Sequence, residues 1–571
     1  MGSNSFVFLL FILFSCANCD FLLQPQNGQI DGGKVRLKKS EKFNNALNTG
    51  HYEGILRLKN GIINGTIGYT KSGRQYMQFY GIPFAEPPVG ELRFKNPVPA
   101  KPWNGIRDAS QPPPKCIQPN YRSGGGLAGQ EDCLYLNVFV PKDLFIASSG
   151  KIPVMIGIHG GAFTTGACIE YTPDYIMERD VIFVTTNYRL SLLGFFGLNN
   201  DQLSGNFGLK DQSLAIRWVS KNIARFGGDP QNVTLIGQSA GSASVHLQMF
   251  SPLSKGLFQK AIMQSGSAFS RWAVANETTT KYKNKIILQK TGCDSNDTLE
   301  ILKCLQSVPA EDLTAIGLQF DGGVKLAPIV ESKVKNRPFL PVKPAPDTYQ
   351  TRVPWLTGVN SGEGAMFVQG YLSNGTWMAK QINSNRRKYI PNLNQYDITA
   401  KPEDIDTVTQ KVIDFYFGAE KIGLDTASEL VNMMTDSTFM QPFRKTVQSS
   451  NESQYVYLYD HEGTSSFLSY NNLTLCLGVG HAHELPLIYR QESFESRWNL
   501  QDKKVSSNLL KFWINFAISG DPNRHCVKKV WKPVQSEDIE YLHIKTDSMI
   551  MKKNPFQERF EFWESLPTGW N

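Results

Sequence analysis

The segment Asn232-Val-Thr-Leu-Ile-Gly-Gln-Ser-Ala-Gly-Ser-Ala-Ser-Val-His246 decides how the rest of the chain is interpreted. Its apolar start, Val233 to Ile236, indicates a strand, and the small residues after Gly241 indicate a helix. Between them lies Gly-x-Ser-x-Gly, and a serine on so tight a turn needs small neighbours such as Gly237 and Gly241. A helix N-terminus at Ser239 would also favour a developing negative charge. A plain glycine and serine turn would fit these five residues alone, but the strand and helix around them predict that Ser239 is a nucleophile.

Length and charge restrict the class of protein. The 571 residues, 41% of them hydrophobic, can bury a large core. Length alone would permit roughly three or four domains, although large α/β enzymes often form one unit. The 59 basic and 51 acidic residues make the chain mildly basic. Since they form no concentrated basic stripe, we expect no nucleic-acid partner.

The N-terminus has the features of a secretion signal. The apolar run Phe6 to Phe14 is too short to span a bilayer, and Ala17 and Cys19 occupy small-x-small positions after it. No Lys or Arg precedes the run, which departs from the usual pattern. We expect a signal peptide at residues 1–19 and a loose extension at residues 20–50. Because the C-terminus carries neither an apolar tail nor a retention tetrapeptide, we expect a secreted, extracellular protein without a membrane anchor.

Cysteines and sequons agree with secretion. Of nine cysteines, two lie in the signal and seven remain, so at least one thiol is free or pairs with another chain. Cys116 with Cys133, and Cys293 with Cys304, are close enough in sequence to close short loops, each disulfide worth about 2–4 kcal/mol. Glycans are expected at Asn64, Asn276, Asn296, Asn374, Asn451 and Asn472. Burial should leave the sequon at Asn232 unmodified, because it introduces the nucleophile strand.

Strand and helix patterns alternate along the middle of the chain. We expect strands at Cys133–Val140, Val154–Ile158, Val181–Asn187 and Lys260–Gln264, and a helix at Leu209–Phe226. This spacing indicates an α/β fold with a mostly parallel sheet covered on both faces. Beyond Thr278 the pattern is mainly helical until strands return at Val353–Val359, Tyr455–Tyr459 and Tyr541–Lys545. No repeat or linker divides the chain, so a single domain over residues 51–571 is expected, with long helical insertions.

A glycine loop follows one of the buried strands. The residues His159-Gly160-Gly161-Ala162 are similar to the loop that donates backbone N–H groups in lipases and esterases. Small side chains are needed there because the backbone itself must reach the oxyanion. A tight Gly-Gly turn is the alternative for this loop alone. Taken together with Ser239, the glycine loop predicts an oxyanion hole formed by the N–H groups of Gly161, Ala162 and Ala240.

The combined motifs resemble the type-B carboxylesterases, a cholinesterase-like family with the α/β-hydrolase fold, and more narrowly the secreted insect esterases. The resemblance extends from about residue 65 to residue 570. Besides the serine turn, it rests on Glu131-Asp-Cys-Leu-Tyr-Leu-Asn-Val138, Asn187-Tyr-Arg189, Gly208-Leu-Lys-Asp-Gln212, Phe226-Gly-Gly-Asp-Pro-Gln-Asn-Val-Thr234 and Gln264-Ser-Gly266. It implies a large, mostly parallel sheet flanked by helices, a Ser-Glu-His triad in that chain order, and a buried structural ion pair between Arg189 and Asp211.

The resemblance also implies the two partners of the serine. Gly358-Val-Asn-Ser-Gly-Glu-Gly-Ala-Met-Phe367 matches the acid motif, which gives Glu363. Gly478-Val-Gly-His-Ala-His-Glu-Leu485 matches the base motif, which gives His481. His483, two residues later, is expected to serve loop hydrogen bonding, and the other histidines to be structural. A metal site at residues 481–484 would need further ligands that the sequence does not cluster, so no metal and no cofactor are expected.

Two places where cholinesterases carry aromatic residues lack them in this sequence, and both bear on substrate preference. Cholinesterases bind a quaternary ammonium on a tryptophan shortly before the Glu-Asp-Cys-Leu motif. Tyr121–Gln130 contains no tryptophan, and Met366 stands where cholinesterases carry an aromatic residue. We therefore expect a serine carboxylesterase that hydrolyses uncharged esters through an acyl-enzyme on Ser239, as a monomer or homodimer.

Two alternatives stay open. Gln238 and the Gly478–His481 segment are similar to juvenile hormone esterases, so juvenile hormone esterase activity is one alternative. A second is a catalytically silent adhesion or binding protein of the same fold. Such proteins lack a triad member, whereas this chain has all three.

Overall fold

The computed structural model describes residues 54–120, 125–147, 151–319, 326–373, 377–464, 477–524, 530–535 and 537–569. Several expected features lie outside these ranges: the signal peptide, the whole N-terminal extension at residues 20–50, the sequons at Asn374 and Asn472, and the cysteines Cys476 and Cys526.

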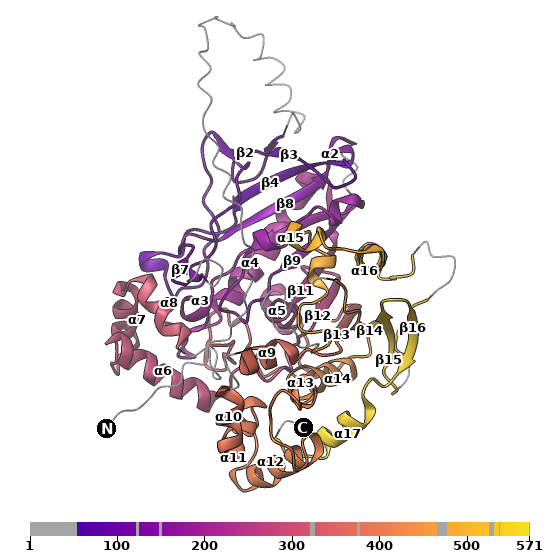
Figure 1. Cartoon of the computed structure of the whole chain (residues 1–571). Coiled ribbons are helices and arrows are strands. Elements are labelled where there is room, and N and C mark those ends of the chain that lie inside the picture. The colour runs from indigo at the N-terminus through magenta and orange to yellow at the C-terminus, as the bar shows by residue number, and fades with distance from the viewer. Residues whose placement is uncertain are drawn as a thin grey trace, which may run out of the picture.

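Eleven strands of the described residues form one sheet, with the order β16-β15-β14-β13-β12-β11-β9-β10-β8-β4-β3 (Figure 1). Their bounds are β3 (Thr66–Tyr69), β4 (Gln75–Pro83), β8 (Tyr135–Pro141), β9 (Ile152–Ile158), β10 (Ile182–Thr186), β11 (Gly228–Gln238), β12 (Lys260–Gln264), β13 (Trp355–Asn360), β14 (Gln454–Asp460), β15 (Glu540–Lys545) and β16 (Met549–Lys553). All neighbours from β10 to β15 are parallel, whereas β8, β4, β3 and β16 pair antiparallel. The expectation of a mostly parallel sheet is confirmed.

The central strands are apolar because both faces of the sheet are covered. Successive residues point to opposite faces: Leu235 packs in one hydrophobic cluster and Ile236 in another. On the first face lie α4 (Phe207–Asn222), continued by a 3-10 turn to Phe226, and α5 (Ala240–Phe250). On the opposite face lies α16 (Leu500–Ser519), which begins with a capping box between Asn499 and Asp502.

Helical insertions extend from the strand ends, as expected beyond residue 278. They are α6 (Glu277–Thr291), α7 (Thr298–Ser307), α8 (Ala310–Leu318), α9 (Ala365–Ser373), α10 (Trp377–Ser384), α11 (Arg386–Leu393), α12 (Pro402–Tyr416), α13 (Ala427–Thr435), α14 (Gln441–Gln448) and α17 (Gln557–Glu564). In Figure 1, α10 to α12 lie below the sheet and α6 to α8 at its left. Helices α9 to α13 pack their apolar faces into a separate cluster, together with Trp563 of α17 and Leu566. No helix in the described part of the chain is both long and apolar enough to cross a membrane.

Smaller elements complete the structure. They are β1 (Ile55–Arg57), β2 (Ile62–Asn64) and β5 (Ile106–Asp108), which form a three-stranded sheet, the pair β6 (Gln118–Pro119) and β7 (Leu127–Ala128), and the short helices α2 (Lys142–Ala147), α3 (Ser191–Phe195) and α15 (Glu492–Glu495).

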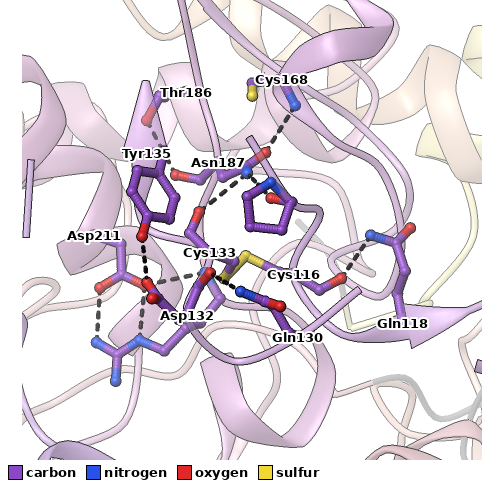
Figure 2. Close-up of a disulfide and its surroundings, with 12 residues drawn as sticks. Cys116, Gln118, Gln130, Asp132, Cys133, Tyr135, Cys168, Thr186, Asn187 and Asp211 are labelled. Carbon is purple, nitrogen blue, oxygen red and sulfur yellow. Dashed lines mark hydrogen bonds and ion pairs between the residues drawn. A yellow bond between two sulfur atoms is a disulfide. The ribbon is translucent and has the colours of Figure 1, made fainter. Parts of the chain in front are cut away.

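The first disulfide lies beside an asparagine that connects three loops (Figure 2). Cys116 and Cys133 are bonded, as expected. Asn187 donates its side-chain amide to the carbonyl groups of Pro114 and Cys133, at 2.9 and 3.0 Å, and accepts from the backbone N–H of Cys168 at 2.9 Å. These bonds fix the loop after β10 against the start of β8.

The second expected disulfide, between Cys293 and Cys304, joins the chain after α6 to α7. Among the described cysteines, Cys168 is free. It is buried, and burial raises the pKa of its thiol to about 12. A thiol with so little thiolate character is a structural residue.

The buried ion pair between Arg189 and Asp211 is also present. The guanidinium donates through Nε and Nη2 to the two carboxylate oxygens at 2.8 and 2.7 Å, and the backbone N–H of Arg189 donates to Asp211 at 3.0 Å. Both side chains are almost fully buried, so removing one partner alone would leave an uncompensated charge. This pair ties the loop after β10 to α4.

Candidate functional site

Ser239 occupies a strained turn between β11 and α5. Its backbone angles, φ 59° and ψ −124°, are rarely adopted by a non-glycine residue. A Cβ on Gly237 would lie 2.4 Å from the carbonyl carbon of Gly241, and a Cβ on Gly241 would lie 2.1 Å from the carbonyl oxygen of Ile158. Both glycines are therefore required for the close approach of strand and helix, and the turn presents Ser239 at the end of the sheet.

The glycine loop lies directly against this turn. A Cβ on Gly160 would approach the Cβ of Ser239 to 3.2 Å. Gly161 and Ala162 have positive φ values of 103° and 56°. The carbonyl of Gly161 accepts from the N–H groups of Thr164 and Thr165, each at 2.9 Å, whereas the N–H groups of Gly161 and Ala162 donate no hydrogen bond within the described residues. The loop thus keeps donors available beside the serine, as an oxyanion hole requires.

Glu363 and His481 form the second half of the site. Nδ1 of His481 lies 2.6 Å from Oε2 of Glu363, and both side chains are buried. The other carboxylate oxygen accepts the backbone N–H of Asn360 at 2.8 Å. With Nδ1 as donor to the carboxylate, the neutral imidazole presents Nε2 as an acceptor. This tautomer is the one that a general base acting on a serine needs.

The side chain of Gln238 contacts that second nitrogen. Its amide nitrogen lies 3.1 Å from Nε2 of His481. Within the described residues, no hydrogen bond joins Nε2 to the hydroxyl of Ser239. Catalytic hydrogen bonds often tighten only when substrate is bound, and the contact with Gln238 places Nε2 of His481 next to the serine turn. The sequence identified Gln238 only as a subclass marker and missed this contact.

Glu484 is a further buried carboxylate, and it is near enough to Glu363 to interact with it electrostatically. The side-chain amide of Asn360 donates to Glu484 at 2.8 Å and to the carbonyl of Gly480 at 2.7 Å, and Gln264 donates to Glu484 at 3.1 Å. Burial raises the pKa of Glu484 to about 7, against the opposing effect of Asn360. Asn360 thereby links both carboxylates to the loop that carries His481. This network was not expected from the sequence, although Asn360 stands three residues before Glu363.

His483 has a different role from its neighbour. Its Nδ1 accepts from the N–H of Gly480 at 3.2 Å, and Nε2 donates to the carbonyl of Glu462 at 2.7 Å. Burial lowers its pKa to about 4, which favours this neutral form. The expectation that His483 serves loop hydrogen bonding is confirmed.

Two further histidines are structural, as expected. His159 stacks on Tyr188 with ring centroids 4.3 Å apart. His246 is fully buried, accepts from the N–H of Ala268 and bonds to the hydroxyl of Tyr349. Among the described residues, no group of three or more His, Cys, Asp or Glu side chains is arranged to hold a metal ion.

Three aromatic side chains near His481, namely Phe439, Trp272 and Phe163, form what we call the aromatic wall. Between α13 and α14 the chain forms a π-helical turn, Asp436–Met440, of a kind often found at functional sites. It places the ring of Phe439 4.8 Å from the imidazole of His481. Trp272 lies 6.3 Å from Phe439 and 6.4 Å from Phe163, which follows the glycine loop. These rings form an apolar surface beside the imidazole of His481, which sequence periodicity had not indicated.

The described sequons differ in exposure. Asn64, Asn296 and Asn451 are exposed, whereas Asn276 is half-buried and caps α6 by accepting the N–H of Thr279. Asn232 is half-buried, and its amide nitrogen donates to the carbonyl of Ile518 at 3.1 Å. That bond agrees with the expectation that Asn232 stays unmodified, although its burial is only partial.

The chain is similar to known esterases in sequence and in fold. A family model for the carboxylesterase family matches residues 53–563. Esterase E4 of Myzus persicae is 34% identical over 90% of this chain and 93% of its own, and juvenile hormone esterase of Tribolium castaneum is 33% identical over 89% and 93%. The crystal structure of juvenile hormone esterase from Manduca sexta, with OTFP covalently attached, superimposes with a TM-score of 0.81 at 28% identity, over 90% of this chain and 99% of that one. The α/β-hydrolase fold expected from the sequence is confirmed.

Proposed function

Because the chain belongs to the carboxylesterase family and is a carboxylic ester hydrolase, we propose that Ser239, His481 and Glu363 are its catalytic triad. The observation that carries the proposal is the 2.6 Å contact between Nδ1 of His481 and Glu363, with Nε2 turned toward the serine turn. A glycine loop with available N–H groups beside Ser239 supports it further.

In the proposed mechanism, Nε2 of His481 takes the hydroxyl proton of Ser239 as the oxygen attacks the ester carbonyl. The tetrahedral oxyanion is stabilised by the N–H groups of Gly161, Ala162 and Ala240. His481 then gives its proton to the leaving alcohol, and an acyl-enzyme remains on Ser239. Water, activated by the same imidazole, releases the acid. Glu363 holds the tautomer and stabilises the imidazolium, and no step calls for a cofactor.

We propose uncharged esters as the substrate class. The wall beside His481 is built from Phe439 and Trp272, which offer apolar surface, and the segment before the Glu-Asp-Cys-Leu motif contains no tryptophan for a quaternary ammonium. Juvenile hormone esterase activity is the second candidate. It is favoured by Gln238 in the serine turn and by the similarity to two proteins of that name.

We further propose that residues 51–571 form one domain and that the protein is secreted, glycosylated at the exposed sequons, and monomeric or homodimeric. One sheet running from β3 to β16 and a family match over residues 53–563 support the single domain. Two disulfides and the apolar N-terminal run support secretion.

Turnover by the purified protein tests the substrate class. A panel should hold short-chain nitrophenyl esters, choline esters and juvenile hormone, with the Ser239→Ala variant as control. The proposal requires uncharged esters to be turned over and choline esters to be poor. A kcat/KM for juvenile hormone far above that for every simple ester would select the second candidate, and preference for choline esters would contradict both.

A further inference from the structure

The π-helical turn between α13 and α14 lies close to both proposed partners of the serine. Its Phe439 packs against the imidazole of His481, with ring centroids 4.8 Å apart. The hydroxyl of Thr435, the residue directly before the turn, accepts the backbone N–H of Gly364 at 2.9 Å. Gly364 directly follows Glu363 in the sequence. One short segment therefore packs against the base and is bonded beside the acid.

The turn departs from α-helical geometry in its hydrogen bonding. The backbone N–H of Gln441 donates to the carbonyl of Asp436, which is five residues earlier rather than four. Because an α-helix has 3.6 residues per turn, one extra residue rotates the side chains that follow it by about 100° around the helix axis. The place of Phe439 against His481 therefore depends on whether the π-helical turn is maintained.

Asp436, the first residue of this turn, is a carboxylate bonded to two other helices. Its Oδ2 accepts the hydroxyl of Tyr416 on α12 at 2.5 Å and lies 3.3 Å from Nε of Arg559 on α17. The hydroxyl of Tyr416 in turn accepts the indole N–H of Trp563, also on α17, at 2.8 Å. Contacts from α12 and α17 thus fix the start of the turn.

Stability alone gives little reason for a carboxylate at this position. Asp436 is 1% exposed, and its Oδ1 has no hydrogen-bond partner within the described residues. Burial raises the pKa of Asp436 to about 7, against the opposing effects of Arg559 and Tyr416. A buried ion pair with incomplete hydrogen bonds often stabilises a fold no better than apolar side chains of similar volume do. The contacts of Asp436 therefore point to a role other than stability.

We propose that Asp436 is a positioning residue for catalysis: its contacts with Tyr416 and Arg559 maintain the π-helical turn, and the turn holds Phe439 against His481. An aromatic ring packed on the imidazole restricts its rotation, so that Nε2 stays directed at the serine turn. The ring also stabilises the imidazolium that forms during proton transfer. This inference rests on the proposed function, because Asp436 acts through the proposed base.

A double-mutant cycle on the full-length protein tests this route. Asp436→Asn and Phe439→Leu should each lower kcat by about tenfold or more, on small and large nitrophenyl esters alike and with less change in KM, because the base loses its alignment. The double variant should match the slower single variant within about twofold, since both changes act through one contact. If Asp436→Asn does not fold, Tyr416→Phe, which removes the hydroxyl bonded to Asp436, replaces it in the cycle.

The matched control is Val412→Ala on α12, in a hydrophobic cluster separate from that of Phe439. It should lower the melting temperature, yet keep kcat within about twofold, because it leaves a cavity and removes no contact of Asp436. Unchanged kcat in the single variants, losses that multiply in the double variant, or an equal loss in Val412→Ala would overturn the inference. Wild-type activity in Ser239→Ala would instead refute the proposed function.

Discussion

At the scale of single residues, the two ring nitrogens of His481 contact two different side chains, a carboxylate and an amide. Glu363 accepts from one nitrogen of His481, and the amide of Gln238 contacts the other. His483, two residues along the chain, has both nitrogens engaged with backbone groups. Position in the loop alone could not separate the two histidines, whereas their hydrogen-bond partners do.

The two histidines should therefore respond differently to removal. His481→Ala should lower kcat by about 3 to 6 orders of magnitude, as for a triad whose members act as a unit. His483→Ala should keep activity within about tenfold and chiefly lower stability, because it loses bonds that position the loop. Circular dichroism would verify folding of both variants. A folded, inactive His483 variant beside an active His481 variant would show that the base is misassigned.

Replacing Gln238 tests its contact with the base. In Gln238→Glu a carboxylate next to Nε2 would favour the protonated imidazole. Since the base must be neutral to accept a proton, the acid limb of the kcat/KM profile should move about one pH unit upward. Gln238→Met, which has similar volume and no charge, is the control. An unchanged limb in the Glu variant would mean that this contact does not exist in the working enzyme.

At the scale of elements, the site is assembled at the carboxyl ends of neighbouring parallel strands. Ser239 follows β11, Glu363 follows β13, and the loop carrying His481 comes after β14. The apolar runs and the glycines around each motif made these elements predictable from local sequence. The π-helical turn at Asp436–Met440 was not, because it depends on contacts of Asp436 with Tyr416 and Arg559 that come from distant segments.

The serine turn should tolerate no side chain at its second glycine. In Gly241→Ala the new Cβ would lie 2.1 Å from the carbonyl oxygen of Ile158, so β9 and α5 must separate. We expect a loss of about 3 kcal/mol or more in unfolding free energy, or failure to fold. Gly423→Ala is the control, since its Cβ would meet nothing within 4 Å. Denaturant unfolding of the two variants should differ, and equal stability would refute this view of the turn.

The burial of His246 in α5 makes the stability of the protein depend on pH. Burial lowers the pKa of His246 from 6.5 to about 3. Below pH 6.5 the unfolded chain therefore binds a proton that the folded chain does not, and the stability contributed by this residue falls as pH drops. His246→Gln should be destabilised at pH 8, but its deficit should shrink by about 2 kcal/mol at pH 5. Urea unfolding at the two pH values measures this, and a constant deficit would contradict it.

At the scale of the whole molecule, the sequence predicted what is local and missed what depends on three-dimensional arrangement. The serine turn, the glycine loop and the parallel core strands each come from a short stretch with its own pattern, and the proposed partners Glu363 and His481 come from the resemblance to a family. The contact of Gln238 with His481 spans 243 residues, and it follows from the strand order rather than from either motif. The edge strand β16 was also missed, because it is short and partly exposed.

The central claim is that Ser239 is the residue that becomes acylated, and covalent labelling tests it most directly. The protein should be treated with a dialkyl phosphofluoridate, which phosphorylates activated serines, and then analysed by intact mass and peptide mapping. We expect one phosphoryl group per chain, located on Ser239, with complete loss of esterase activity, and neither label nor activity in Ser239→Ala. A label on another residue, or wild-type activity in Ser239→Ala, would contradict the account.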